Sequence, residues 1–195
     1  MDDFFMYLRL GFRHIIDWGG SDHILFILTL TLRYIWKDWK QLLILVTAFT
    51  IGHSITLALS TLDWLSIPSA IIELLIPVTI ILTGLTNFRV KNFQFDSKYP
   101  IIYFFALFFG LIHGMGFSYY LKSLLGKEEA IIMHLLSFNI GLELGQLLVV
   151  AVILIISFIF VGLFKADRKR YVQMGSGLAL LLALTMVIDR IVSFF

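Results

Sequence analysis

The sequence predicts an all-α membrane protein, a single bundle of six transmembrane helices, and three observations lead to this fold class. The 195-residue chain is 59% hydrophobic and only 14% charged, whereas soluble domains carry about 25% charged residues. Its mean hydropathy is +0.95. Apolar stretches of about 20 residues, the length that a helix needs to cross a hydrocarbon core, recur along the chain. No polar stretch is long enough to fold alone, so we expect one transmembrane domain, residues 1–195, surrounded by the lipid bilayer.

Six spans account for the apolar stretches, and they lie near residues 22–36, 41–62, 67–88, 100–121, 136–163 and 171–194. The first span is short, and the segment that leads into it, GFRHIIDWGGSDHILF, carries several ionisable side chains. Because Gly19 and Gly20 interrupt this segment, we expect a broken, glycine-containing start to the first span. The acidic beginning of the chain, MDDFFMYLRL, has no basic region or cleavage site, so no signal peptide is expected.

The Lys and Arg residues are distributed unevenly between the loops. Ten of the fifteen lie after the first, third and fifth spans. By the positive-inside rule these loops face the cytoplasm, which leaves both termini outside. The net charge is only +2 and the basic residues lie in short loops, so no nucleic-acid partner is expected. The absence of cysteine excludes disulfides, thiolate ligands and cysteine nucleophiles.

Polar residues from five of the expected spans converge on the outer half of the membrane. His53 and His113 each lie about nine residues inside the outer end of a span, roughly 13 Å deep at 1.5 Å per residue. Ionisable side chains are costly within a membrane, so their convergence predicts a functional site. The candidate residues are Asp22, His23, His53 and His113, with His14, Glu73, Asn139 and Glu143 as further ligands or as partners of the ligands.

Several of these polar residues also have purely structural explanations. Thr56 and Ser60 share a helix face with His53 and could form hydrogen bonds between helices. The four-residue spacing of Gly110 and Gly114 is typical of close helix packing. Asp22 could cap a helix, and a structural carboxylate–histidine pair would account for a buried Glu.

Histidines combined with carboxylates form a nitrogen–oxygen ligand set. Such a set suits zinc, nickel, cobalt, iron or manganese better than magnesium or Cu(I). The sequence therefore predicts a divalent transition-metal ion as the ligand of this site.

Four segments of the chain resemble the HupE/UreJ family of small bacterial membrane proteins. They are GFRHIIDWGGSDHILF, FTIGHSITL, FGLIHGMGFS and FNIGLELGQ. The family is associated with nickel or cobalt uptake for hydrogenase and urease, so the resemblance implies a metal-handling protein of the bacterial inner membrane. A His…Asp-His motif in the family's first helix corresponds to His14, Asp22 and His23, and a later His-Gly motif corresponds to His113–Gly114.

Three functions are consistent with these residues. The resemblance favours a transporter that passes nickel, cobalt or zinc inward, although few polar residues mark an exit path through the inner halves of the later spans. The second is a membrane-embedded metallohydrolase, in which the metal activates water and Glu73 or Glu143 acts as the base. The third is an assembly or sensing factor with a structural metal. The sequence also allows a homo-oligomer without specifying one.

Overall fold

The computed structural model describes residues 2–17, 21–90, 101–125 and 131–193. Within these ranges there are seven α-helices and no β-strand, so the predicted all-α fold class is confirmed. The α-helices are α1 (Asp2–Ile16), α2 (Ser21–Thr31), α3 (Trp39–Thr61), α4 (Ser69–Phe88), α5 (Ile101–Leu125), α6 (Ile131–Ser157) and α7 (Arg168–Val192). A 3-10 turn, Trp36–Asp38, leads into α3, and a π-helical segment, Phe158–Leu163, continues α6.

Five helical stretches of the described chain are long and apolar enough to cross a membrane. They are Trp36–Thr61, Ser69–Phe88, Ile102–Leu124, Ile131–Leu163 and Arg168–Val192. These stretches correspond to the last five expected spans and define a multi-pass membrane protein. The first expected span corresponds to α2, which has 11 residues and is too short to cross a membrane alone.

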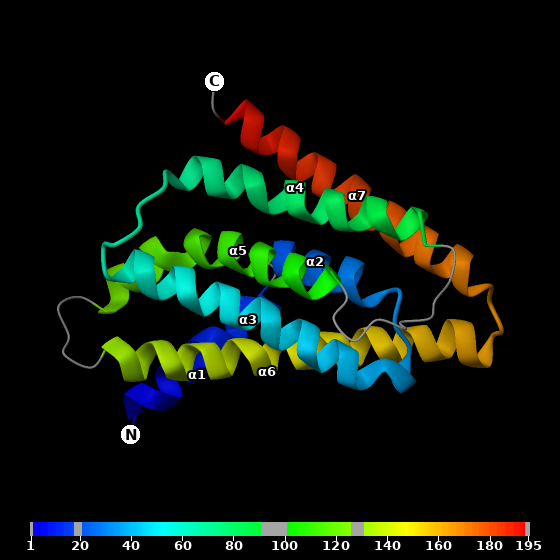
Figure 1. The fold of residues 1–195 in the computed structure, drawn as a ribbon, viewed down its shortest axis with the longest axis horizontal. Helices are drawn as coiled ribbons and strands as arrows, with labels where there is room; N and C mark the ends of the chain where they lie inside the picture. Colours follow the sequence, from blue (N-terminus) through cyan, green and yellow to red (C-terminus); the bar gives the residue numbers. More distant parts are fainter. Residues whose placement is uncertain (1, 18–20, 91–100, 126–130, 194–195) are drawn as a thin grey trace.

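The N-terminal part of the chain forms two separate helices. In Figure 1 the chain runs from left to right through α1 and then α2, and the following helices alternate in direction. Helix α1 ends at Ile16 and α2 begins at Ser21. Gly19 and Gly20, which the sequence predicts as the cause of the break, lie outside the described residues.

The other helices pack in three close pairs, α3 with α5, α1 with α6, and α4 with α7 (Figure 1). Glycines allow the first two pairs to approach closely. A Cβ atom built at Gly110 would overlap the carbonyl group of Phe49, and one built at Gly11 would overlap that of Phe138. Because helices in a membrane associate largely through van der Waals packing, these contacts between backbones stabilise the pairs.

Helix α2 contacts members of two of these pairs, α1 and α6 on one side and α4 and α7 on the other. Polar contacts with α4 and α7 fix its C-terminal end. The side-chain amide of Asn87 donates to the carbonyl oxygen of Thr29 at 2.7 Å and to Oγ of Ser176 at 2.8 Å. Nε of Arg33 donates to Oδ1 of Asn87 at 3.0 Å. These bonds hold α2 in place and so help to position the side chains at its first turn.

Candidate metal site

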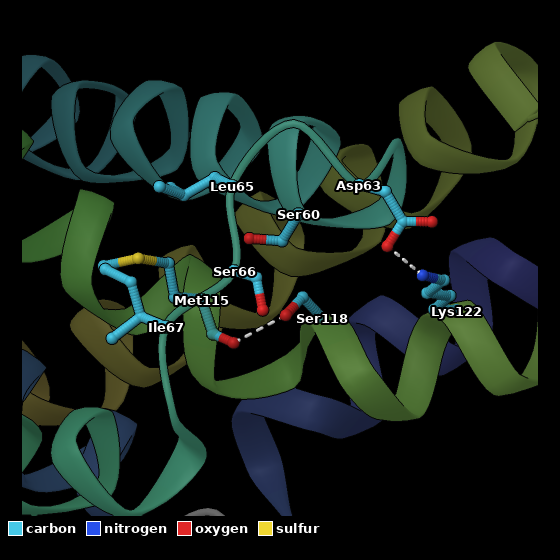
Figure 2. Close-up of a pocket in the computed structure, with 8 residues that line it drawn as sticks. All are labelled: Ser60, Asp63, Leu65, Ser66, Ile67, Met115, Ser118 and Lys122. Atoms are coloured by element: carbon cyan, nitrogen blue, oxygen red, sulfur yellow. Dashed lines mark hydrogen bonds and ion pairs between the residues drawn. The ribbon is translucent and has the colours of Figure 1, made fainter.

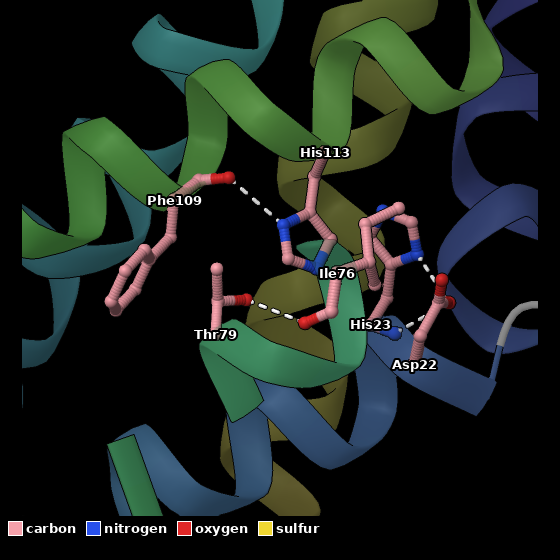
Figure 3. A network of polar contacts seen from close by, with 6 residues as sticks. All are labelled: Asp22, His23, Ile76, Thr79, Phe109 and His113. Carbon is pink, nitrogen blue, oxygen red and sulfur yellow. Dashed lines mark hydrogen bonds and ion pairs between the residues drawn. The ribbon is translucent and has the colours of Figure 1, made fainter. Parts of the chain in front are cut away.

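Four histidines from four helices converge in the bundle, His14 from α1, His23 from α2, His53 from α3 and His113 from α5. We call these residues the histidine cluster. One ring nitrogen from each of the first three lies within 4.8 Å of the other two. The ring centroid of His113 lies 5.1 Å from that of His23, with the two rings edge to face, and Figure 3 shows them side by side.

The nitrogen atoms that these rings present to one another are buried. The exposed fractions of His23, His53 and His113 are only 3%, 0% and 1%. Among the described residues, Nε2 of all four rings has no hydrogen-bond partner, and Nδ1 of His53 has none either. Leaving a buried polar atom without a partner costs free energy. A metal ion that accepts these nitrogen lone pairs would remove that cost, so the residues fit a metal ion on chemical grounds.

Hydrogen bonds at the opposite nitrogen orient two of the rings (Figure 3). Nδ1 of His23 donates to Oδ1 of Asp22 at 2.9 Å, and the backbone N–H of His23 donates to the same oxygen at 2.8 Å. Nδ1 of His113 donates to the carbonyl oxygen of Phe109 at 2.8 Å. Metal-binding histidines usually donate their second N–H to a carboxylate or carbonyl group, which fixes the tautomer and turns the other nitrogen toward the metal. Asp22, predicted as a ligand, thus lies where it orients His23.

Phenylalanine rings enclose the histidine cluster. The ring of Phe117 lies 4.0 Å from that of His14, and the ring of Phe138 stacks on His53 at 6.4 Å between centroids. An apolar shell of this kind limits access of water to a metal site. Sequence reasoning did not identify these rings, because the chain contains 19 phenylalanines and nothing in their spacing distinguishes these two.

The close packing of α3 on α5 brings two cluster histidines together. A Cβ atom built at Gly114, next to His113, would overlap the backbone of His53. The glycine therefore allows the two histidine-bearing segments to approach each other. The hydroxyl of Thr56 donates to the carbonyl oxygen of Gly52 in its own helix at 3.2 Å, which agrees with a structural explanation for this residue.

The other three predicted site residues have partners elsewhere. Glu73 forms an ion pair of 2.9 Å with Arg190 of α7, and the two side chains are 42% and 47% exposed. Glu143 accepts a hydrogen bond of 2.7 Å from the hydroxyl of Thr47. Asn139 donates to a carbonyl oxygen of its own helix at 2.8 Å. The structure does not bring these three residues into the group of ligand atoms formed by His14, His23 and His53.

A small polar pocket lies where α3 ends, beside the last turns of α5 (Figure 2). Its lining residues are Ser60, Asp63, Leu65, Ser66, Ile67, Met115, Ser118 and Lys122. Its volume of about 30 Å³ is enough for one or two water molecules. Asp63 and Lys122 form an ion pair at its edge. Ser60 lies seven residues after His53 in α3, and Ser118 lies five residues after His113 in α5. The pocket is therefore displaced from the histidine cluster toward the C-terminal ends of both helices.

The fold and the histidine cluster define a class, a multi-pass helical membrane protein whose buried imidazoles suit a transition metal. A family model described as HupE / UreJ protein matches residues 1–190. The chain belongs to the HupE/UreJ family, which is associated with nickel and cobalt uptake, and the resemblance found in its sequence is confirmed. Searches among curated proteins and among solved structures found no match.

Proposed function

We propose that this protein transports a divalent transition-metal ion, nickel, cobalt or zinc, across the bacterial inner membrane and binds it at the histidine cluster. The proposal depends on one observation, the three unpartnered and mutually close ring nitrogens of His14, His23 and His53. His113 adds a fourth imidazole beside them. Imidazole nitrogens are suitable ligands for all three ions. The association of the family with nickel and cobalt uptake supports the same function.

In this proposal α1 and α2 together form the first of six membrane traverses. Their common direction in Figure 1 supports this topology. Transporters commonly build ion sites where a helix is discontinuous within the membrane. His14 lies near the end of α1 and His23 near the beginning of α2, so the two residues flank such a discontinuity.

We expect both termini to lie outside the cytoplasm, because ten of the fifteen basic residues fall in or beside the connections on the opposite side. Reporter fusions at Lys169 and at Lys127 test this orientation. A reporter that is active only in the cytoplasm should be active at Lys169 and inactive at Lys127, and a periplasmic reporter should give the reverse. Periplasmic activity at Lys169 would contradict the proposed orientation.

With this orientation, the pocket at the ends of α3 and α5 opens on the outer side of the histidine cluster. Ser60 and Ser118 supply hydroxyl groups between the surface and the cluster. We therefore regard the pocket as the hydrated approach through which the ion reaches the histidines.

The function is tested with purified protein in detergent and in lipid vesicles. Elemental analysis should find about one transition-metal ion per chain, as expected for a single three- or four-imidazole site. Protein-containing vesicles should take up Co²⁺ faster than protein-free vesicles. Protein that binds a metal tightly but moves none would instead support the assembly or sensing role. Protein that binds no metal would contradict both the transport function and the assembly or sensing role.

The hydrolase alternative has less support from the geometry. It requires a carboxylate beside the metal as the base for water. Glu73 is paired with Arg190, and Glu143 is bonded to Thr47. In the described part of the chain, the carboxylate that does contact the cluster is that of Asp22, whose Oδ1 accepts two hydrogen bonds from His23.

The orienting role of Asp22 gives a quantitative prediction. The Asp22→Asn variant should bind Co²⁺ about 10- to 100-fold more weakly, because an amide does not hold the His23 ring and its tautomer as a carboxylate does. Competition against a chromophoric chelator measures the affinity. Asp189→Asn is the matched control, since Asp189 is exposed near the end of α7. If both variants bind as the unmodified protein does, Asp22 does not act through His23.

A further inference from the structure

The polar side chains of α3 extend from His53 in the direction away from the polar pocket. Thr50 and Thr47 precede His53 by three and six residues. The hydroxyl of Thr50 donates to Oε1 of Gln146 at 2.8 Å, and the hydroxyl of Thr47 donates to Oε1 of Glu143 at 2.7 Å. Thr50 and Gln146 are buried, and Glu143 is half-buried. Two hydrogen-bonded pairs of oxygen-bearing side chains thus connect α3 and α6.

Two independent paths along the helices place these groups beyond the cluster. On α3, Thr47 is six residues from His53, which corresponds to roughly 9 Å. On α6, Phe138 stacks on His53, and Glu143 follows it by five residues, or roughly 7.5 Å. Thr47 is eight residues from the start of α3 and 14 from its end. The groups therefore lie near the middle of the bundle, farther from the pocket than His53 is.

Glu143 is the member of these two pairs that packing does not explain. Hydroxyl–amide bonds such as that between Thr50 and Gln146 are common between membrane helices. A carboxylate is different, because placing an acidic side chain at the centre of a membrane helix costs about 2.5–3.5 kcal/mol. An ionised carboxylate has about four sites that can accept hydrogen bonds. Among the described residues, Glu143 has one side-chain donor, the hydroxyl of Thr47.

We infer that Thr47, Thr50, Glu143 and Gln146 form a second, inner binding station that receives the divalent cation from the histidine cluster. This inference rests on the proposed transport function and supplies the inner part of the path. The cation would neutralise the Glu143 carboxylate and be coordinated by oxygen atoms. Nickel, cobalt and zinc bind less tightly to a few hydroxyl, amide and carboxylate oxygens than to several imidazoles. An ion at the inner station is therefore released readily, which conduction through successive sites requires.

The test compares binding with transport in the Glu143→Gln variant. Binding of Co²⁺ to the histidine cluster should keep its affinity and its stoichiometry, because Glu143 is not among the cluster ligands. Uptake of Co²⁺ into vesicles should fall about 10- to 100-fold, because the amide cannot neutralise the ion. Thr47→Val, which removes the hydroxyl from a side chain of nearly the same shape, should also reduce uptake while binding is retained.

Glu73→Gln is the matched control, since it makes the same chemical change at an exposed carboxylate paired with Arg190. It should leave both binding and uptake unchanged. Uptake at the rate of the unmodified protein in Glu143→Gln overturns the inner station while leaving the proposed function intact. Parallel loss of cluster-bound Co²⁺ in Glu143→Gln and Thr47→Val also overturns it, because the residues would then support the cluster itself. If the unmodified protein neither binds nor moves Co²⁺, the proposed function fails first.

Discussion

Replacing His53 with alanine is expected to abolish tight binding of transition metals. Both ring nitrogens of His53 are buried without a hydrogen-bond partner among the described residues, and one of them lies within 4.8 Å of ligand atoms of His14 and His23. Removing the ring leaves a site with one nitrogen ligand fewer. The loss of affinity should exceed the 10- to 100-fold that is typical when only an orienting partner is removed. Isothermal titration with Co²⁺ and elemental analysis of the purified variant measure the effect.

His134→Ala is the control for this experiment. His134 is also buried in a membrane-spanning helix, but its ring stacks on Tyr7 at 4.3 Å between centroids and does not belong to the histidine cluster. The His134→Ala variant should therefore retain its metal. Full metal occupancy in the His53→Ala variant would mean that His53 is a packing residue, and the proposed site would have to be abandoned.

Adding a single methyl group at Gly110 is expected to disrupt the fold and the site together. A Cβ atom at this position would overlap the carbonyl group of Phe49 and lie 3.1 Å from the backbone nitrogen of His53. Backbone atoms cannot move aside as the end of a flexible side chain can, so α3 and α5 must separate. Overpacking of this kind typically costs about 1–3 kcal/mol. Because His53 and His113 lie on the two separating helices, the affinity for Co²⁺ should fall as well.

Thermal unfolding in detergent, with and without Co²⁺, measures the effect of Gly110→Ala. A loss of about 1–3 kcal/mol should lower the Tm by several degrees, since each kcal/mol corresponds to about 2–4 °C for a chain of this size. Gly177→Ala is the matched control, because the nearest atom to its added Cβ would be Cζ of Phe88 at 3.9 Å, an ordinary van der Waals contact. An equal Tm for the two variants would show that the α3–α5 contact is less tight than the structure indicates.

Hydropathy and length were sufficient to predict the all-α class and the five long helical stretches. They did not predict where α2 ends. The expected first span continued to residue 36, whereas α2 ends at Thr31 and the chain then turns. Besides local backbone bonds, a partner far along the sequence holds this turn, since Arg33 donates to Asn87, 54 residues later. Apolar periodicity reports burial, but it carries no information on such long-range partners.

Residue counting could not predict the direction in which each polar side chain points. His23, His53 and His113 were identified because imidazoles are unusual in apolar helices, and the structure brings them together. The direction of a side chain around its helix depends on which neighbours pack against it. Glu73 therefore meets Arg190 of α7, and Glu143 meets Thr47 of α3, although both were expected to face the histidines.

The role of Asp22 depended on a finer detail, the rotamers of two adjacent residues. On a regular helix, neighbouring side chains point in different directions, so the pair looked like two separate ligands. The hydrogen bond between the Asp22 carboxylate and Nδ1 of His23 forms at the first turn of α2. The sequence provided both groups, but only the three-dimensional arrangement shows that the Asp22 carboxylate is bonded to the His23 ring.

The pairing of α1 with α6 also determines when during biosynthesis the proposed site can exist. His14 and His23 leave the ribosome early, yet His113 follows only in α5, after more than half of the chain has been made. Helix α1 packs on α6, where Gly141 faces the backbone of Leu8. The final position of His14 is therefore set only once α6 has entered the membrane. A partly synthesised chain would therefore lack the complete proposed site until α6 has been inserted.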